Sequence, residues 1–420
     1  MRDETKCLHA GYTPKNGEPR VMPIYQSTTY VFDSTKEVGD VFDEPTKAII
    51  YSRFANPTVM AVEEKIAALE GGVGAMCTTS GQGASLLSIL NICKAGDSFI
   101  AAATIYGGTI NLFSATLKKQ GIECIFVDQN ADEETLSAAF KPNTKAVFGE
   151  TIANPALCVL DIEKFARVAH KHGVPLIVDN TFATPVLCKP FDFGADIVVH
   201  STSKYMDGHA VQVGGVIVDS GNFDWKNGNF PEFTEPDETY HGITYTDNYG
   251  KAAYIIKARM QLMRDYGMYP AANSAFLLNL GLETLALRME RYSENALKVA
   301  QYFTQSDKIE KVIYSGLEND EYYDLAKKYL KGSSGVISII IKGGKENAVK
   351  FMDGLKLASN EVHVADIRTC VLHPASETHR QLTEEQLVAA GIHPGMIRFS
   401  VGLENVEDII EDIEQSLKGI

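Results

Sequence analysis

Short apolar segments alternate with helical stretches from about residue 51 onward, and this alternation limits the possible fold more than any other feature. Helices are predicted at 58–69 and 162–172, where apolar residues share one face. The predicted strands are apolar at consecutive positions, as is typical of strands buried on both faces. They lie at 75–79, 98–102, 124–127, 146–148, 175–178, 197–199 and 215–218. The pattern predicts an α/β fold with a mostly parallel sheet flanked by helices.

The 420 residues exceed what one small core organises, so we expect more than one domain. Residues 1–50 are polar and rich in turns, which predicts an extended N-terminal arm that requires another surface to order it. The larger domain is expected over 51–270. A smaller C-terminal α+β domain is expected over 271–420, with a strand at 336–343 and an amphipathic helix near 406–417.

Composition excludes several classes of protein. The formal charge of −15 repels phosphates and no basic stripe is visible, so we expect no nucleic-acid partner. No apolar run approaches the roughly 20 residues that span a bilayer, and the first residues lack a signal-peptide core. The seven cysteines are scattered and form no CxxC pair, which disfavours a disulfide framework. We therefore predict a cytoplasmic protein without a membrane partner.

Two predicted strand ends carry residues suited to a pyridine-containing cofactor. Asp179 ends the strand 175–178, and a half-buried carboxylate needs a cation such as a protonated ring nitrogen, or several donors. The alternative is that Asp179 caps a turn. Lys204 follows the next strand, and a lysine near low-dielectric walls becomes the neutral nucleophile that a Schiff base requires. An exposed lysine is the alternative, but its polar neighbours favour the cofactor site.

A phosphate site is predicted from two turns. Gly81 and Gln82 lie in a strand–turn–helix junction whose backbone amides suit an anion. Ser201 and Ser203 stand on alternate positions, from which both hydroxyls can donate to a phosphate. The glycines nearly match GxGxxG, but Leu86 replaces the third glycine, so a dinucleotide site is the weaker alternative.

Three further residues suit ligand binding. Tyr106 follows the strand 98–102, where an aromatic ring can stack on a cofactor, although packing is its more usual role. Arg53, two residues after Tyr51, offers a fork for phosphate or carboxylate, with a surface salt bridge as the alternative. Arg398 lies in an apolar run where an unpaired charge is costly, so a substrate carboxylate or an internal acid is expected opposite it.

Two other features carry weaker predictions. Residues 219–249 have no periodicity, and so long a loop in a compact domain is more often functional than accidental. A metal site is disfavoured because His373 and His379 are not at the i, i+4 spacing of a helical ligand pair. We expect His363, His373 and His379 to be polar structural residues.

In the sequence around these candidate residues, the chain closely resembles the Cys/Met-metabolism family of fold-type-I enzymes that use pyridoxal 5'-phosphate (PLP). The resemblance covers essentially the whole chain. It rests on YSRFANPT (51–58), TSGQGA (79–84), YGGT (106–109), ETIANP (150–155), VDNTFATP (178–185), HSTSKY (200–205) and IRFSVGLE (397–404). Several blocks in one order around a single lysine are far more specific than any block alone.

The resemblance implies a role for each candidate residue. Lys204 would carry PLP as a Schiff base, Asp179 would pair with the pyridine nitrogen, and Tyr106 would stack on the ring. The phosphate would be held by Gly81, Gln82, Ser201 and Ser203, with Tyr51 and Arg53 from a neighbouring subunit. The groups expected to act in catalysis are Lys204, Tyr106 and Tyr51. Arg398 and Asn154 would bind the substrate, with Asn154 also near the cofactor's phenolic oxygen.

Within the family, the segments 219–249 and 370–392 are similar to those of O-acetylhomoserine sulfhydrylases. Gly108 stands where methionine γ-lyases usually carry cysteine. In contrast, His363 replaces a small polar residue and Glu377 interrupts the usual HPASTTH. The resemblance implies γ-replacement on O-acetyl-L-homoserine by sulfide or methanethiol, in a homotetramer of two active dimers.

The first alternative is a methionine γ-lyase that eliminates methanethiol and leaves 2-oxobutyrate and ammonia. A nucleotide-binding oxidoreductase would depend on the glycine turn alone. A non-catalytic interaction protein is the weakest alternative, because the polar residues at the strand ends all suit one cofactor.

Overall fold

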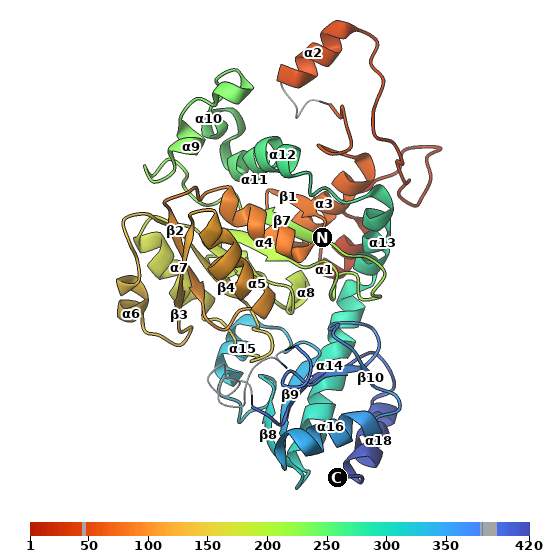
Figure 1. Ribbon diagram of the computed structural model, residues 1–420. Helices are drawn as coiled ribbons and strands as arrows, with labels where there is room; N and C mark the ends of the chain where they lie inside the picture. The colour runs from red at the N-terminus through yellow and green to blue at the C-terminus, as the bar shows by residue number, and fades with distance from the viewer. Residues whose placement is uncertain (44–47, 379, 381–392) are drawn as a thin grey trace.

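The computed structural model describes residues 1–43, 48–378, 380 and 393–420. Two sheets organise the chain, and helix α14 (Leu285–Thr304) runs from the larger body into the smaller one (Figure 1). Helices flank the larger sheet. The α/β class predicted from the sequence is confirmed.

The larger sheet has seven strands in the order β1-β7-β6-β5-β4-β2-β3. They are β1 (Gly74–Thr78), β2 (Ser98–Ala102), β3 (Glu123–Val127), β4 (Thr144–Glu150), β5 (Leu176–Asp179), β6 (Ile197–His200) and β7 (Gly215–Asp219). All pairs from β3 to β6 are parallel, whereas β7 runs antiparallel to both β6 and β1. The sheet is therefore mostly parallel, as expected.

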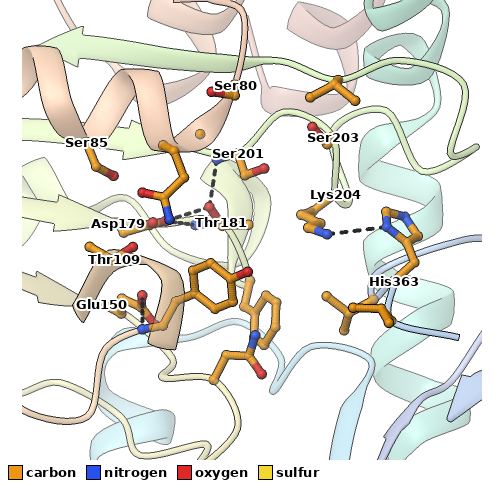
Figure 2. Close-up of a pocket in the computed structure, with 18 of the residues that line it drawn as sticks. Ser80, Ser85, Thr109, Glu150, Asp179, Thr181, Ser201, Ser203, Lys204 and His363 are labelled. Atoms are coloured by element: carbon orange, nitrogen blue, oxygen red, sulfur yellow. Dashed lines mark hydrogen bonds between the residues drawn. The ribbon is translucent and has the colours of Figure 1, made fainter. Parts of the chain in front are cut away.

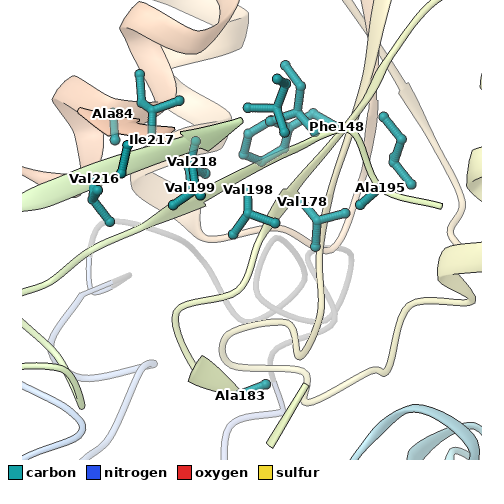
Figure 3. Close-up of a cluster of buried hydrophobic side chains, with 14 of the residues drawn as sticks. Ala84, Phe148, Val178, Ala183, Ala195, Val198, Val199, Val216, Ile217 and Val218 are labelled. Atoms are coloured by element: carbon teal, nitrogen blue, oxygen red, sulfur yellow. The ribbon is translucent and has the colours of Figure 1, made fainter. Parts of the chain in front are cut away.

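Burial on both faces explains why the strands are apolar throughout. Val178, Val198 and Val218 on adjacent strands are wholly buried, and they lie side by side in the sheet (Figure 3). Side chains of this size contribute roughly 1.5–3 kcal/mol each when fully buried. These strands set the position of every residue that follows them at the carboxyl edge of the sheet.

The helices around this sheet begin where the sequence supplies caps. In α3 (Pro57–Glu70), the Asn56 side chain accepts from the Thr58 amide at 3.0 Å, and Gly71 ends the helix at φ +86°. In α7 (Ile162–Lys171), Asp161 accepts from the Lys164 amide. The others before the second sheet are α4 (Gly81–Leu90), α5 (Gly107–Asn111), α6 (Glu133–Ala138), α8 (Thr184–Leu187), α11 (Ala253–Lys257), α12 (Arg264–Tyr266) and α13 (Ala272–Glu283).

Residues 1–50, for which the sequence predicts an extended arm, contain two helices. Helix α1 (Asp3–His9) packs on α3 and α14 of the same chain, where Cys7 is buried. Helix α2 (Thr35–Asp43) projects away from the body (Figure 1). Contact of this arm with a neighbouring subunit stays a prediction.

The segment 219–249 forms the short helices α9 (Pro231–Thr234) and α10 (Tyr245–Tyr249) around a cluster of aromatic rings. Trp225 stacks on Phe233 and Tyr254, with ring centroids 4.4 and 5.2 Å apart. Packing accounts for much of this segment, because these three rings are buried.

The smaller sheet has the order β10-β11-β12-β9-β8, with all pairs antiparallel except β10 with β11. Its strands are β8 (Ile309–Ile313), β9 (Val336–Ile341), β10 (Ser359–Asn360), β11 (Cys370–Leu372) and β12 (Met396–Ser400). Its helices are α15 (Tyr323–Tyr329), α16 (Gly344–Gly354) and α18 (Val406–Leu417). The boundary near residue 270 stays a prediction.

All seven cysteines have free thiols, and six of them are buried. Within the described residues, none of the helices combines the length and the apolarity that a bilayer crossing requires.

A buried ion pair joins α3 to the sheet. Arg259 Nη2 lies 2.6 Å from Glu63 Oε2, and the other oxygen of Glu63 accepts from the Cys77 amide of β1 at 2.8 Å. The Glu63 side chain is only 6% exposed. Arg259→Met leaves this carboxylate buried without its cation, so we expect a loss of about 3–5 kcal/mol in the free energy of unfolding.

The matched control is Arg167→Met. Arg167 pairs with Glu133 at 2.7 Å, but both side chains are more than half exposed, so the loss should stay within about 1 kcal/mol. Urea unfolding of both variants measures the difference. Equal losses would show that the buried pair does not stabilise the fold.

Candidate active site

A cavity of about 530 Å³ opens at the carboxyl ends of β4, β5 and β6. Segments from both bodies line it, because residues 362–364 and Arg398 of β12 face the loops of the larger sheet. Figure 2 shows Asp179, Glu150 and Lys204 converging on this space. Carboxyl ends of parallel strands are where α/β proteins bind ligands.

Two carboxylates stand side by side on the cavity wall. Glu150 of β4 is paired in register with Asp179 of β5, so the parallel pairing itself brings the two acids together. Burial, reinforced by the charge of Asp179, raises the pKa of Glu150 well above its usual range. The raised pKa favours the protonated form of Glu150, and its Oε1 accepts from the Tyr106 amide at 2.6 Å.

The Asp179 carboxylate is held by one oxygen only. Oδ1 accepts from the amide and the hydroxyl of Thr181, at 2.9 and 2.5 Å, and among the described residues no donor reaches Oδ2. Burial raises the pKa of Asp179, and the bonds from Thr181 oppose that effect. A cation placed at Oδ2 would hold Asp179 in its charged form.

Lys204 lies at the other side of the cavity. Burial, with the nearby Arg398 charge, lowers the pKa of Lys204 to about 8, which raises its neutral fraction at physiological pH. Arg288 of α14 holds the loop that follows Lys204. It donates to the carbonyls of Tyr205 at 2.7 Å and Met206 at 3.2 Å. Arg288 thereby ties the lysine loop to the helix that joins the two bodies.

The N-terminus of α4 forms a cradle beside Lys204. Ser80 accepts from the Gly83 amide at 3.0 Å, which leaves the Gly81 and Gln82 amides free of capping bonds at a helix end that lines the cavity. A Cβ on Gly81 would come within 2.6 Å of Ser201, so only glycine permits this approach. Ser203 also lines the cavity, although its hydroxyl is bonded to the Gly214 backbone.

Arg398 is buried without a counter-ion among the described residues. Its Nη1 donates to Asn154 Oδ1 at 3.1 Å and its Nη2 to the His363 carbonyl at 3.0 Å, and Nε has no partner among those residues. Burial lowers its pKa. Of the two partners that the sequence left open, the described residues supply no internal acid, so a ligand carboxylate fits.

Comparison with known proteins assigns the chain to a family. A model of the Cys/Met metabolism PLP-dependent enzyme family matches residues 4–418. The chain belongs to this family. O-acetyl-L-homoserine sulfhydrylase of Leptospira meyeri is 45% identical over 100% of the chain and 97% of its own length. Homocysteine synthase of Schizosaccharomyces pombe is 46% identical over 99% and 98%.

A solved structure agrees with these relatives. A Campylobacter jejuni protein, assigned as an O-acetylhomoserine (thiol)-lyase, superimposes with a TM-score of 0.95 at 36% identity and full coverage of both chains. It carries N'-pyridoxyl-lysine-5'-monophosphate at one position. The family and its PLP cofactor, predicted from the sequence, are thus confirmed.

The polar groups of the cavity match the functional groups of PLP. Asp179 Oδ2 is available to a ring nitrogen, and Gly81 and Gln82 offer backbone donors to a phosphate. The buried Gln82 Oε1 has no partner among the described residues. Lys204 would supply the amine that bonds to the aldehyde carbon.

Not every predicted residue lies at this cavity. Tyr106 does, with half of its surface exposed, but Tyr51 and Arg53 are absent from its lining. Arg53 instead donates to the Arg264 carbonyl and lies over the Tyr51 ring. No residue of 219–249 lines the cavity either.

Of the ionisable residues that line the cavity, sequence reasoning missed Glu150 and His363. Glu150 opens the ETIANP block, which was noticed for Asn154 alone. His363, expected to be a structural residue, lines the cavity, and its Nδ1 lies 3.3 Å from Lys204 Nζ. His373 instead bonds the Pro394 carbonyl, and His379 lies outside the described residues. In the described part of the chain, no three potential ligands gather in a way that would hold a metal ion.

The lowered pKa of Lys204 predicts how the cofactor-free protein takes up PLP. Only the neutral amine attacks an aldehyde, so the rate of covalent uptake should rise with pH around a midpoint near 8, and not near the ordinary lysine value. Visible absorbance after mixing with PLP at a series of pH values measures the rate.

Lys257→Met is the matched control. Burial also lowers the pKa of Lys257 to about 8, but its ammonium bonds the Asn91 carbonyl outside the cavity. This variant should keep the midpoint, whereas Lys204→Ala should form no covalent adduct. A midpoint above pH 10 in the unaltered protein would contradict the proposed effect of burial.

Proposed function

We propose that this chain catalyses γ-replacement, converting O-acetyl-L-homoserine and sulfide, or methanethiol, to L-homocysteine, or L-methionine, and acetate. The observation that carries the proposal is that one cavity is lined by both Lys204 and Arg398, which has no counter-ion among the described residues. Full-length relatives named O-acetyl-L-homoserine sulfhydrylase and homocysteine synthase support the sulfhydrylase over a methionine γ-lyase.

Each residue of the cavity has a proposed role. Arg398, oriented by Asn154, binds the substrate carboxylate. Asp179 would hold the proton on the ring nitrogen, while Glu150, whose pKa is raised by burial, fixes the backbone of Tyr106. Tyr106 stacks on the ring, and Asn154 also lies near the phenolic oxygen of PLP.

The phosphate is proposed to bind at the cradle formed by Gly81, Gln82, Ser201 and Ser203. Bound PLP supplies an electron sink for a carbanion at Cα. Lys204 moves the protons, first from Cα and then from Cβ, so that acetate can leave from Cγ and sulfide can add there.

The second subunit of the active unit is proposed to supply Tyr51 and Arg53. Tyr51 is 41% exposed, and the arm before it presents Val21, Tyr25 and Val31 to solvent. Exposed apolar side chains in such number suit an interface. We propose an active dimer, two of which form a homotetramer. The free thiols of all seven cysteines support a cytoplasmic location.

Product analysis tests the reaction. Purified protein with PLP is given O-acetyl-L-homoserine plus sulfide, and separately L-methionine, and the products are quantified by mass spectrometry. We expect homocysteine in the first mixture and little 2-oxobutyrate in the second. Abundant 2-oxobutyrate with little homocysteine would assign a methionine γ-lyase instead.

Subunit mixing tests the shared site. Lys204→Ala and Arg53→Ala should each be nearly inactive, since one lacks the amine and the other a phosphate contact. If Arg53 acts across the interface, refolding an equal mixture should restore about a quarter of the activity, because half of the dimers are mixed and each has one intact site. Each variant refolded alone is the control. No recovery in the mixture would place Arg53 in its own subunit's site or outside both sites.

A further inference from the structure

The imidazole of His363, in the smaller body, lies against the amine of Lys204, in the larger body. His363 lies between β10 and β11, and its Nδ1 is 3.3 Å from Lys204 Nζ, across 159 positions of sequence (Figure 2). The ring lines the same cavity as Asp179 and Arg398. It belongs to none of the sequence blocks that the family shares.

The backbone of His363 is fixed on the side away from the cavity. Its carbonyl accepts from Arg398 Nη2 at 3.0 Å and from the Cys370 thiol at 3.6 Å. The next residue, Val364, is buried. These contacts hold the imidazole beside Lys204, so the 3.3 Å approach is a property of the site and not of a free surface side chain.

The ring has capacity for a proton. Nε2 is buried and has no partner among the described residues, so only Nδ1 faces a polar group. A neutral imidazole carries its hydrogen on one nitrogen and a lone pair on the other. With the hydrogen on Nε2, the Nδ1 lone pair accepts directly from the Lys204 ammonium.

The surroundings of His363 favour the neutral form of its ring. Burial and then the Lys204 charge lower the pKa of His363, while Asp366, Glu361 and Asp207 oppose that effect. Arg398 faces it only through the His363 carbonyl. Asp366 is already paired with Arg368 at 2.8 Å, so it does not fix a proton on the imidazole.

We propose that His363 is a second proton acceptor of the active site, which takes from Lys204 the proton that the lysine has removed from Cα. The inference rests on the proposed γ-replacement, in which two C–H bonds of one substrate must break before acetate leaves. Lys204 returns to its neutral form when Nδ1 of His363 takes its proton. The lysine is then again a base when the Cβ–H bond is to be broken.

The protons and electron pairs balance over the cycle. The electron pair of the Cα–H bond stays on carbon while Lys204 gains the proton. The electron pair of the Nζ–H bond then stays on Nζ while His363 gains that proton. The Cβ proton then goes to Lys204, and acetate departs with the Cγ–O pair. Hydrosulfide brings the new pair to Cγ, and the two stored protons return to the carbons. No oxidant or reductant is required.

Isotope exchange separates the two proton removals. The holoenzyme is incubated in D2O with L-norvaline, which lacks a leaving group at Cγ, and loss of the α and β proton signals is followed by NMR. In His363→Asn, we expect the rate of α exchange to stay within about threefold of that of the unaltered enzyme. The rate of β exchange should fall on the order of 10²-fold, as for loss of a general base. An unchanged ratio of the two rates would overturn the inference.

His373→Asn is the matched control. His373 is buried and its pKa is also lowered by burial, but it bonds the Pro394 carbonyl away from the cavity. Its exchange ratio should equal that of the unaltered enzyme. Absence of α exchange in the unaltered enzyme would overturn the proposed function together with this inference, whereas normal exchange with a normal ratio in His363→Asn would overturn this inference alone.

A second readout needs no turnover. In the cofactor-free protein, His363→Leu removes the acceptor of the Lys204 ammonium, so the pKa of the lysine should fall further. The pH midpoint of PLP uptake should therefore move down by about one unit. An unchanged midpoint would mean that Lys204 and His363 do not share a proton, which would also overturn the inference.

Discussion

The site depends on buried charges that face no opposite charge within the described chain. Among the described residues, no donor reaches the second oxygen of Asp179, and no carboxylate lies within ion-pair distance of Lys204 or Arg398. Such groups are costly in a low-dielectric cavity unless a ligand completes them. A ligand with a cationic nitrogen, a phosphate and a carboxylate supplies the missing partners, so its binding stabilises the folded chain.

The strand ends explain how much of this site the sequence predicts. Because the strands are buried on both faces, their apolar runs mark their positions, and Asp179 and the Ser201–Lys204 turn follow directly. Glu150 was missed because the apolar run stops at Phe148, two residues before β4 ends. His363 follows no strong strand and reaches Lys204 only through the packing of the two bodies, which no local pattern encodes.

The sequence also did not predict the direction of β7 or the packing of residues 219–249. The apolar run of β7 predicts a strand but not its antiparallel course, which fits the connection from β6 because residues 201–214 contain no crossover helix. Residues 219–249 look like a functional loop since polar residues separate their aromatic rings. The rings meet only after folding, and together they form packing that lies outside the cavity.

This aromatic cluster also has an optical consequence. Trp225 is the one tryptophan of the chain, and it is 4% exposed between Phe233 and Tyr254. Its fluorescence therefore originates from the 219–249 segment and from nowhere else, whereas visible absorption would come from PLP at the proposed Lys204 site. Two wavelengths thus report on two separate regions of one chain, without any added label.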